Sequence, residues 1–187
     1  MSRDADRARL VEIIKARSFT TGREIKLASG RSSSFYFNMK PTMLDPEGAR
    51  LIGSLICAAL EGKNADMVGG LEMGAVPIAT AVAVMSCSTG RPLPAFFVRK
   101  QAKEHGTQSL VEGLPKGETL KGRRVVILED VTTTGGSAMK AIEAVRADGA
   151  VVERVITIVD RLEGAAETFQ AAGIAFEPIL TAADFKD

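Results

Sequence analysis

Cysteine and histidine are scarce in this sequence, with two cysteines and one histidine among 187 residues. Cys57 and Cys87 do not have the spacing of a metal-binding or redox motif, which argues against a zinc site and a disulfide framework. Each lies in an apolar, helix-like segment. We therefore expect two buried, reduced thiols.

A long hydrophobic run and an excess of one charge are also missing. The longest uncharged stretch, 73–90, contains Pro, Ser, Thr and Gly, and the N-terminal MSRDADRARL is charged where a secretory peptide needs an apolar core. We expect a cytoplasmic protein that does not contact a membrane. The 24 basic and 23 acidic residues nearly cancel, so we expect no nucleic-acid partner, because that requires a basic surface.

The sequence does contain alternating strand-like and helix-like segments. A hydrophobic fraction of 45% in 187 residues suffices for one core, so we expect a single domain over 1–187. The clearest helix signal is Asp45-Pro46-Glu47, an N-cap acid followed by proline in the first turn. The expected helices are 4–17, 45–60, 75–87, 137–148 and 163–172, and the expected strands are 66–68, 95–98, 124–128, 155–159 and 174–180.

The alternation indicates an α/β fold. The run Val125-Val126-Ile127-Leu128 is apolar at every position, which is typical of a parallel strand covered by helices on both faces. Ligands of such sheets bind at the carboxyl ends of the strands. Polar residues that follow a strand are therefore the first candidates for a site.

Such residues follow this run directly, as Glu129-Asp130-Val131 and then Thr132-Thr133-Thr134-Gly135-Gly136-Ser137. Hydroxyls, small glycines and the free N–H groups of a helix N-terminus form a cradle for a phosphate dianion. The two acids would repel that phosphate, so ribose hydroxyls or a hydrated Mg²⁺ suit them better. A Gly-rich turn that only caps a helix is the alternative interpretation. The spacing is not that of a Walker loop.

The segment VVILEDVTTTGGS resembles the signature of type I phosphoribosyltransferases that binds phosphoribosyl pyrophosphate (PRPP). The resemblance implies a central, mostly parallel sheet flanked by helices, with a small hood formed by residues from about 1–40 and the C-terminal region. It also implies that the loop holds the 5-phosphate while the acids hold the ribose. The implied PRPP-binding residues here are Glu129, Asp130, Val131, Thr132, Thr133, Thr134, Gly135, Gly136 and Ser137.

A second polar segment, Arg99-Lys100-Gln101-Ala102-Lys103-Glu104-His105-Gly106, follows the expected strand 95–98. A solvated charged surface is the alternative, but a basic lid over an anionic substrate explains why the only histidine lies among polar neighbours. VRKQAKEHG resembles the catalytic loop of orotate phosphoribosyltransferases. That resemblance implies PRPP contacts from Arg99, Lys100, Lys103 and His105, and catalytic roles for Arg99, Lys103 and His105. Asp130 is the fourth catalytic candidate, because its negative charge near the ribose favours a cation-like ring.

Two further segments concern the base. Ser29-Gly30-Arg31 with 35–38 resembles the hood segment of that family, which implies that Phe37 lies near orotate, although core packing of Phe37 is equally consistent. Asp160-Arg161-Leu162-Glu163-Gly164 resembles the segment whose arginine binds the orotate carboxylate, and Thr133 is the third implied orotate contact. An arginine grips a carboxylate through two hydrogen bonds, and purines carry no carboxylate. A bare Asp-Arg pair is otherwise typical of a surface ion pair.

The resemblance has departures. Ala28 stands where some members have lysine, and Glu72-Met73-Gly74 stands where some have Tyr-Lys-Gly. The resemblance therefore does not extend to a direct cationic contact from Glu72-Met73-Gly74, although the backbone N–H groups of this segment remain available.

The implied reaction transfers ribose 5-phosphate from PRPP to orotate and releases pyrophosphate. Mg²⁺ is the implied cofactor, carried by PRPP and reaching Asp130 through water, with no direct protein ligand. The implied assembly is a homodimer with shared active sites. A purine-base phosphoribosyltransferase and a non-catalytic PRPP-sensing regulator are the rival interpretations, and Arg161 and the absence of a basic surface respectively argue against them.

Overall fold

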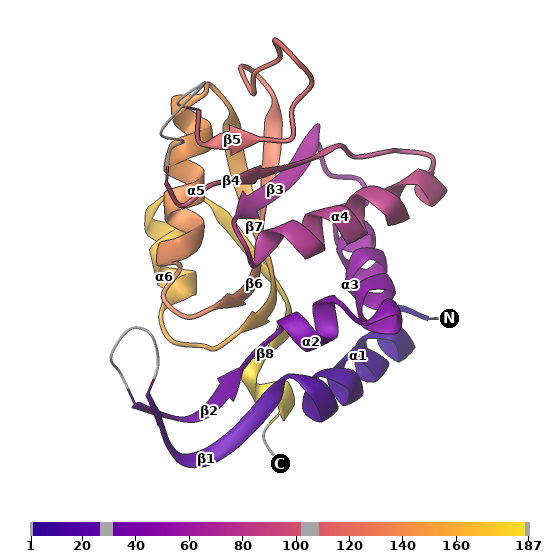
Figure 1. The fold of residues 1–187 in the computed structure, drawn as a ribbon, viewed down its shortest axis with the longest axis vertical. Coiled ribbons are helices and arrows are strands. Elements are labelled where there is room, and N and C mark those ends of the chain that lie inside the picture. The colour runs from indigo at the N-terminus through magenta and orange to yellow at the C-terminus, as the bar shows by residue number, and fades with distance from the viewer. Residues whose placement is uncertain (1, 27–31, 102–108, 186–187) are drawn as a thin grey trace.

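The computed structural model describes residues 2–26, 32–101 and 109–185 of the chain (Figure 1). Its main sheet has the strand order β5-β4-β3-β6-β7-β8, and every neighbouring pair is parallel except β4 and β5. The strands are β3 (Met67–Leu71), β4 (Ala95–Val98), β5 (Val111–Glu112), β6 (Arg124–Thr132), β7 (Val151–Asp160) and β8 (Ala175–Thr181). The predicted α/β fold with a mostly parallel sheet is confirmed.

Helices cover both faces of this sheet, as the apolar run in β6 predicts. Val126 and Leu128 pack with the residues of α3 (Pro46–Ala59) and α4 (Ala75–Ser86), whereas Val125 and Ile127 pack with α5 (Gly136–Ala147) and α6 (Ala165–Ala171). Figure 1 shows these two pairs of helices on opposite sides of the strands. Successive residues of β6 thus belong to two different cores.

A smaller unit lies beside the sheet. Strands β1 (Phe19–Lys26) and β2 (Ser32–Phe37) form an antiparallel pair, which packs with α1 (Arg3–Arg17) and the C-terminal 3₁₀ helix η2 (Ala182–Phe185) (Figure 1). Phe185 contacts Phe19 and Phe37, with ring centroids 5.4 and 4.9 Å apart. The N-terminal and C-terminal segments are therefore joined through one aromatic cluster.

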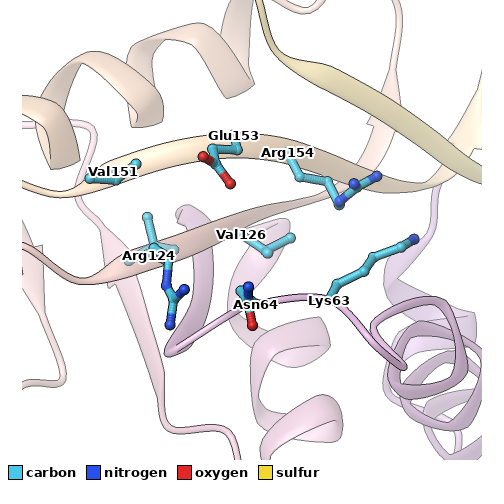
Figure 2. Close-up of a pocket in the computed structure, with 8 residues that line it drawn as sticks. Lys63, Asn64, Arg124, Val126, Val151, Glu153 and Arg154 are labelled. Atoms are coloured by element: carbon cyan, nitrogen blue, oxygen red, sulfur yellow. The ribbon is translucent and has the colours of Figure 1, made fainter.

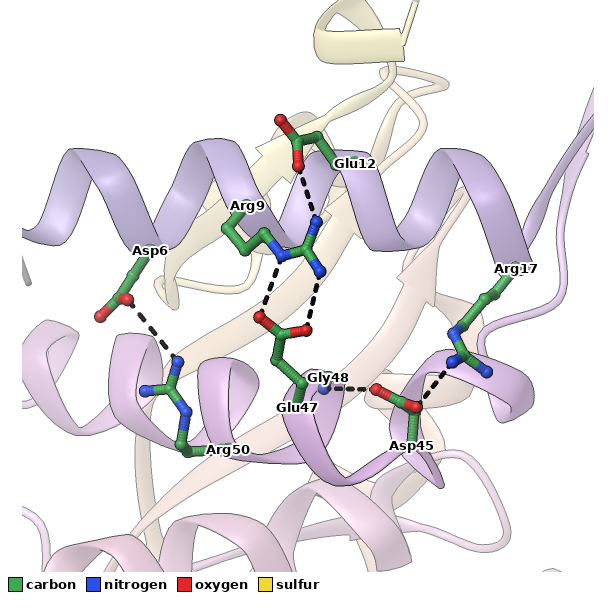
Figure 3. A network of polar contacts seen from close by, with 8 residues as sticks. All are labelled: Asp6, Arg9, Glu12, Arg17, Asp45, Glu47, Gly48 and Arg50. Carbon is green, nitrogen blue, oxygen red and sulfur yellow. Dashed lines mark hydrogen bonds and ion pairs between the residues drawn. The ribbon is translucent and has the colours of Figure 1, made fainter.

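Charged side chains fasten α1 to α3 (Figure 3). Arg9 donates to both carboxylate oxygens of Glu47 at 2.9 and 2.8 Å and to Glu12 at 2.8 Å. Asp45 accepts from the Gly48 N–H at 3.0 Å, which confirms the predicted N-cap of α3, and it also pairs with Arg17. This network joins α1, which packs with the hairpin β1–β2, to α3, which covers one face of the sheet.

Several expectations needed correction. The hairpin β1–β2, the short helix α2 (Lys40–Met43) and strand β5 were not expected, and β6 and β7 are longer than predicted. Cys57 is buried, but Cys87 is exposed, so the prediction of two buried thiols is wrong for Cys87. Cys87 begins the 3₁₀ turn η1 (Cys87–Thr89) after α4, where the chain leaves the core. Within the described ranges, no helix is long and apolar enough to cross a membrane.

Candidate active site

Four loops meet at the carboxyl edge of the sheet, because β4, β3, β6 and β7 are neighbours and run in the same direction. They follow Leu71, Val98, Thr132 and Asp160. Three of the four carry the segments that the sequence singled out for PRPP and the base, and the fourth contains Glu72-Met73-Gly74. This edge is where a parallel sheet binds its ligands.

The loop between β6 and α5 lines a cavity of about 500 Å³. Gly135 precedes α5 with φ +87°, and no side chain caps the first turn of that helix. An added Cβ at Gly135 would lie 3.0 Å from the Phe169 ring, so the backbone conformation and the packing both require glycine here. The helix N–H groups face a site suited to a phosphate dianion. The cavity is lined by Glu129, Val131, Thr132, Thr133, Thr134, Gly135, Gly136, Ser137, Ala138 and Lys140.

The two acids lie within strand β6 and not in the loop where the sequence placed them. The backbone of β6 continues in register with β7 as far as Thr132, opposite Asp160. Glu129 is 7% exposed, and its Oε2 atom has no hydrogen-bond partner among the described residues. Thr132 Oγ1 is likewise buried without a partner there. These two orphaned oxygens fit a ligand that brings hydroxyl groups or water.

Burial raises the pKa of Glu129 well above its ordinary value, and the nearby charge of Asp130 raises it further. Asp130 is less buried, and its Oδ1 accepts a hydrogen bond from the Val131 N–H at 2.9 Å. Both effects favour the neutral form of the Glu129 carboxyl group in the folded protein.

The loop after β3 contacts both of its neighbours. Glu72 Oε1 accepts a hydrogen bond from the Lys100 N–H at 2.9 Å. A Cβ at Gly74 would lie only 2.7 Å from Asp130 Oδ1, so this loop packs closely against the acid, and a larger residue would require the Asp130 side chain to shift. Glu72, Lys100 and Asp130 thus belong to one connected edge of the site.

The basic segment is described only in part. Arg99 is half-buried, its N–H donates to the Leu110 carbonyl at 2.8 Å, and its guanidinium lies 4.0 Å from Glu112. Lys100 is exposed at the same edge. Lys103 and His105 lie outside the described residues, as do Ser29, Gly30 and Arg31.

Arg161 is buried, with 4% exposed. Its guanidinium donates to Glu163 Oε1 at 2.8 Å and to Ser33 Oγ at 2.9 Å, and it lies 4.4 Å from the centre of the Phe35 ring. Its backbone N–H donates to the Thr132 carbonyl at 2.9 Å. Arg161 therefore joins strand β2 to the end of β6, where the phosphate loop begins. It is buried, so it is not the surface ion pair that the sequence alternative described.

Phe37 is 5% exposed and packs against Phe19, Phe35 and Phe185. The core-packing alternative therefore describes its surroundings, and Phe35 is the ring that accompanies Arg161. Sequence reasoning did not single out Ser33 or Glu163. The Ser-rich run before Phe35 and the acid in Asp-Arg-Leu-Glu-Gly were the only signals for them.

A second polar cavity of about 150 Å³ lies at the opposite edge of the sheet, where β6 and β7 begin (Figure 2). Three cations line it, but Glu177 pairs with Lys63 and Arg154, and Asp66 pairs with Arg124. These ion pairs already balance the cations, so this cavity is the weaker candidate for a substrate site. In the part of the chain that is described, no group of three or more His, Cys, Asp or Glu residues could hold a metal ion.

Comparisons with known proteins agree on one family. Residues 43–175 match the phosphoribosyl transferase domain. A protein of Bradyrhizobium diazoefficiens called orotate phosphoribosyltransferase is 62% identical over 99% of this chain and 98% of its own length. The solved orotate phosphoribosyltransferase of Mycobacterium tuberculosis with Fe(III) dicitrate has a TM-score of 0.84 at 40% identity, covering 97% of this chain and 99% of that one. Its complex with PRPP has a TM-score of 0.78 at 37% identity, covering 96% and 98%.

Proposed function

This chain belongs to the phosphoribosyltransferase family and is an orotate phosphoribosyltransferase, and we propose that the cavity at the carboxyl edge of its sheet is where PRPP and orotate react. The reaction gives orotidine 5′-monophosphate and pyrophosphate in pyrimidine biosynthesis. The site must hold a phosphate, a ribose, a leaving pyrophosphate and a base with a carboxylate. Each of these groups has a candidate partner at this edge of the sheet.

The 5-phosphate binds the loop from Thr133 to Ser137, where uncapped helix N–H groups and hydroxyls provide donors. The ribose hydroxyls then reach the two acids at the end of β6. The orphaned Glu129 Oε2 supports this placement, because a buried oxygen without a partner becomes satisfied only when a donor arrives. Asp130 stands beside the ribose, where its negative charge stabilises the cation-like ring carbon as pyrophosphate leaves.

Arg161 binds the orotate carboxylate, and its burial beside the phosphate loop is the single observation that best supports orotate as the base. A purine offers no carboxylate for this cation. We expect Arg161→Ala to raise the KM for orotate by about tenfold or more, while the KM for PRPP changes much less. Steady-state kinetics with each substrate varied in turn measures both. Equal losses for the two substrates would contradict this role.

The charge of PRPP explains the cationic residues and the metal ion of the proposed site. PRPP carries about four to five negative charges, judged from the usual charge of each phosphate group. Arg99 and Lys100 lie at the edge where pyrophosphate leaves, and the sequence resemblance adds Lys103 and His105. Mg²⁺, when bound to PRPP, neutralises part of this charge. Glu129 and Asp130 fit such an ion through ribose and water, because the buried Glu129 Oε2 has no partner among the described residues.

The enzyme works as a homodimer with shared active sites. An apolar groove of about 650 Å³ runs between α2, α3 and α4, and Leu44, Val84 and Met73 on it are 72%, 65% and 59% exposed. Exposed apolar patches of this kind mark protein interfaces. Met73 adjoins Gly74, which lies against Asp130. A second copy on this groove therefore lies beside the active site.

Subunit mixing tests this assembly. Lys103→Ala and Asp130→Ala chains, each nearly inactive, are allowed to re-pair at random. Half of the dimers are then mixed, and one of the two sites in each mixed dimer carries neither lesion. A shared site thus predicts recovery of about a quarter of wild-type activity. If each lid served its own subunit, every site would keep one lesion and no activity would return.

We also infer a cytoplasmic location, because the proposed substrates are small, charged metabolites. The near balance of acidic and basic residues gives no support for a nucleic-acid partner.

A further inference from the structure

The guanidinium of Arg161 is already occupied. Glu163 Oε1 lies 2.8 Å from Nε and 2.7 Å from Nη2, so one carboxylate oxygen contacts two of the three guanidinium nitrogens. Ser33 Oγ accepts from Nη2 at 2.9 Å, and the Phe35 carbonyl lies 3.4 Å from Nη1. The ring of Phe35 covers one face. A substrate carboxylate must therefore displace one of these acceptors or share the cation with Glu163.

Glu163 differs from Arg161 in its freedom to move. The Arg161 side chain is 3% exposed, whereas that of Glu163 is 27% exposed. The turn that carries them is held by the Leu162 N–H, which donates to Asp160 Oδ1 at 2.9 Å, and Leu162 has φ +61°. Such a backbone conformation is unusual for leucine and marks a turn held in place by its surroundings. The guanidinium of Arg161 is thus held in place, whereas the Glu163 carboxylate is free to rotate toward solvent.

We propose that Glu163 is a specificity-determining residue, an internal carboxylate that competes with the carboxylates of orotate and of the product for Arg161. This inference rests on the proposed role of Arg161. If Glu163 leaves, its ion pair is lost when the substrate binds. If it stays, two carboxylates share one cation and repel each other. In both cases the negative charge of Glu163 weakens binding of a carboxylate ligand.

The competition acts equally on substrate and product. The transfer forms a bond at a ring nitrogen of orotate, so the nucleotide product keeps the carboxylate. Glu163 therefore lowers the affinity for orotate but also assists release of orotidine 5′-monophosphate. It has no effect on a ligand that lacks the carboxylate.

Calorimetric titration with two nucleotides isolates this effect. Orotidine 5′-monophosphate and uridine 5′-monophosphate differ only in the carboxylate, and both carry the 5-phosphate. We expect Glu163→Gln to tighten the Kd for the orotidine nucleotide by about three- to tenfold, the size of one partly buried charge contact, and to leave the Kd for the uridine nucleotide unchanged. Glu167→Gln is the matched control, because it removes an exposed acid of α6 instead. It should alter neither Kd.

Two results would overturn the proposal in different ways. If Glu163→Gln leaves the affinity for the orotidine nucleotide unchanged or weakens it, Glu163 positions Arg161 and does not compete. In that case the proposed role of Arg161 still holds if Arg161→Ala abolishes the tighter binding of the orotidine nucleotide over the uridine nucleotide. If Arg161→Ala keeps the preference, the carboxylate binds elsewhere and the role of Arg161 fails as well.

Discussion

Replacing Glu129 by glutamine is expected to stabilise the empty protein and to weaken PRPP binding. The carboxyl group is buried and its Oε2 atom has no partner among the described residues. A buried oxygen that lacks a partner costs about 1–2 kcal/mol, which corresponds to about 2–8 °C in Tm for a protein of this size. Glutamine keeps the shape of the side chain, removes the ionisable group and provides an N–H donor toward Asp130.

The pH dependence distinguishes this cause from a simple packing change. In the unfolded chain Glu129 ionises near its ordinary value of 4.5, whereas burial and the charge of Asp130 keep it protonated to a much higher pH in the folded protein. Its contribution to stability is therefore fully present below the unfolded pKa and is lost as the pH rises toward the folded pKa. Glutamine does not titrate. The Tm advantage of Glu129→Gln should thus be small near pH 5 and larger near pH 8.

Thermal unfolding of the wild type and of Glu129→Gln across this pH range, without PRPP, measures the expected gain in stability. The second effect is a loss of PRPP affinity of about tenfold, because the amide offers the ribose hydroxyls one acceptor oxygen where the carboxyl group has two. Aspartate at position 130 is unchanged in both proteins, so the comparison isolates the Glu129 carboxyl. A lower Tm for the variant at pH 8, or an advantage that does not vary with pH, would refute the reasoning.

Two further predictions concern the loops. Lys103→Ala should lower turnover by about 10²–10³ with little change in Tm, as is typical when a cation that stabilises a leaving group is removed, and an unchanged turnover at saturating substrates would exclude Lys103 from the reaction. Gly135→Ala should cost about 1–3 kcal/mol and weaken PRPP binding, because φ is +87° and the added Cβ meets Phe169 at 3.0 Å. Gly136→Ala is its matched control for stability, since the Cβ there meets only Thr134 Oγ1, at 3.9 Å. Denaturant unfolding of both variants and PRPP titration of Gly135→Ala check this, and equal losses of stability at the two positions would contradict it.

The sheet and its phosphate loop could be predicted from sequence because their signals are local. An unbroken apolar run, a Gly-rich loop and a helical pattern follow one another between Arg124 and Ala147. The hairpin β1–β2 gave no such signal. Its pairing is irregular between Thr21 and Ile25, and its Phe19 and Phe37 pack against Phe185 at the other end of the chain. Tertiary packing, and not local pattern, makes these strands.

The candidate site likewise combines residues that the sequence indicated with residues that only tertiary packing brings together. Resemblance indicated Arg161, and the structure then showed that Ser33, Phe35 and Glu163 surround it. Two of these three are far from Arg161 in sequence, so no spacing rule could link them. The burial of Glu129 could not be predicted either. The sequence does not distinguish an acid that follows a strand from an acid among the last residues of that strand.

The pairing of β6 with β7 explains why one small molecule can be recognised at both ends. Thr132 and Asp160 are register partners, and the Arg161 N–H still donates to the Thr132 carbonyl beyond the last pair. The phosphate loop and Arg161, which we propose binds the carboxylate, therefore start from adjacent points on two hydrogen-bonded strands. Under that proposal, a ligand that contacts both carries a phosphate at one end and a carboxylate at the other. A nucleotide of orotate has both groups, whereas free phosphate or a purine nucleotide has only the phosphate. The proposed selectivity for the base thus depends on this strand pair as well as on Arg161 itself.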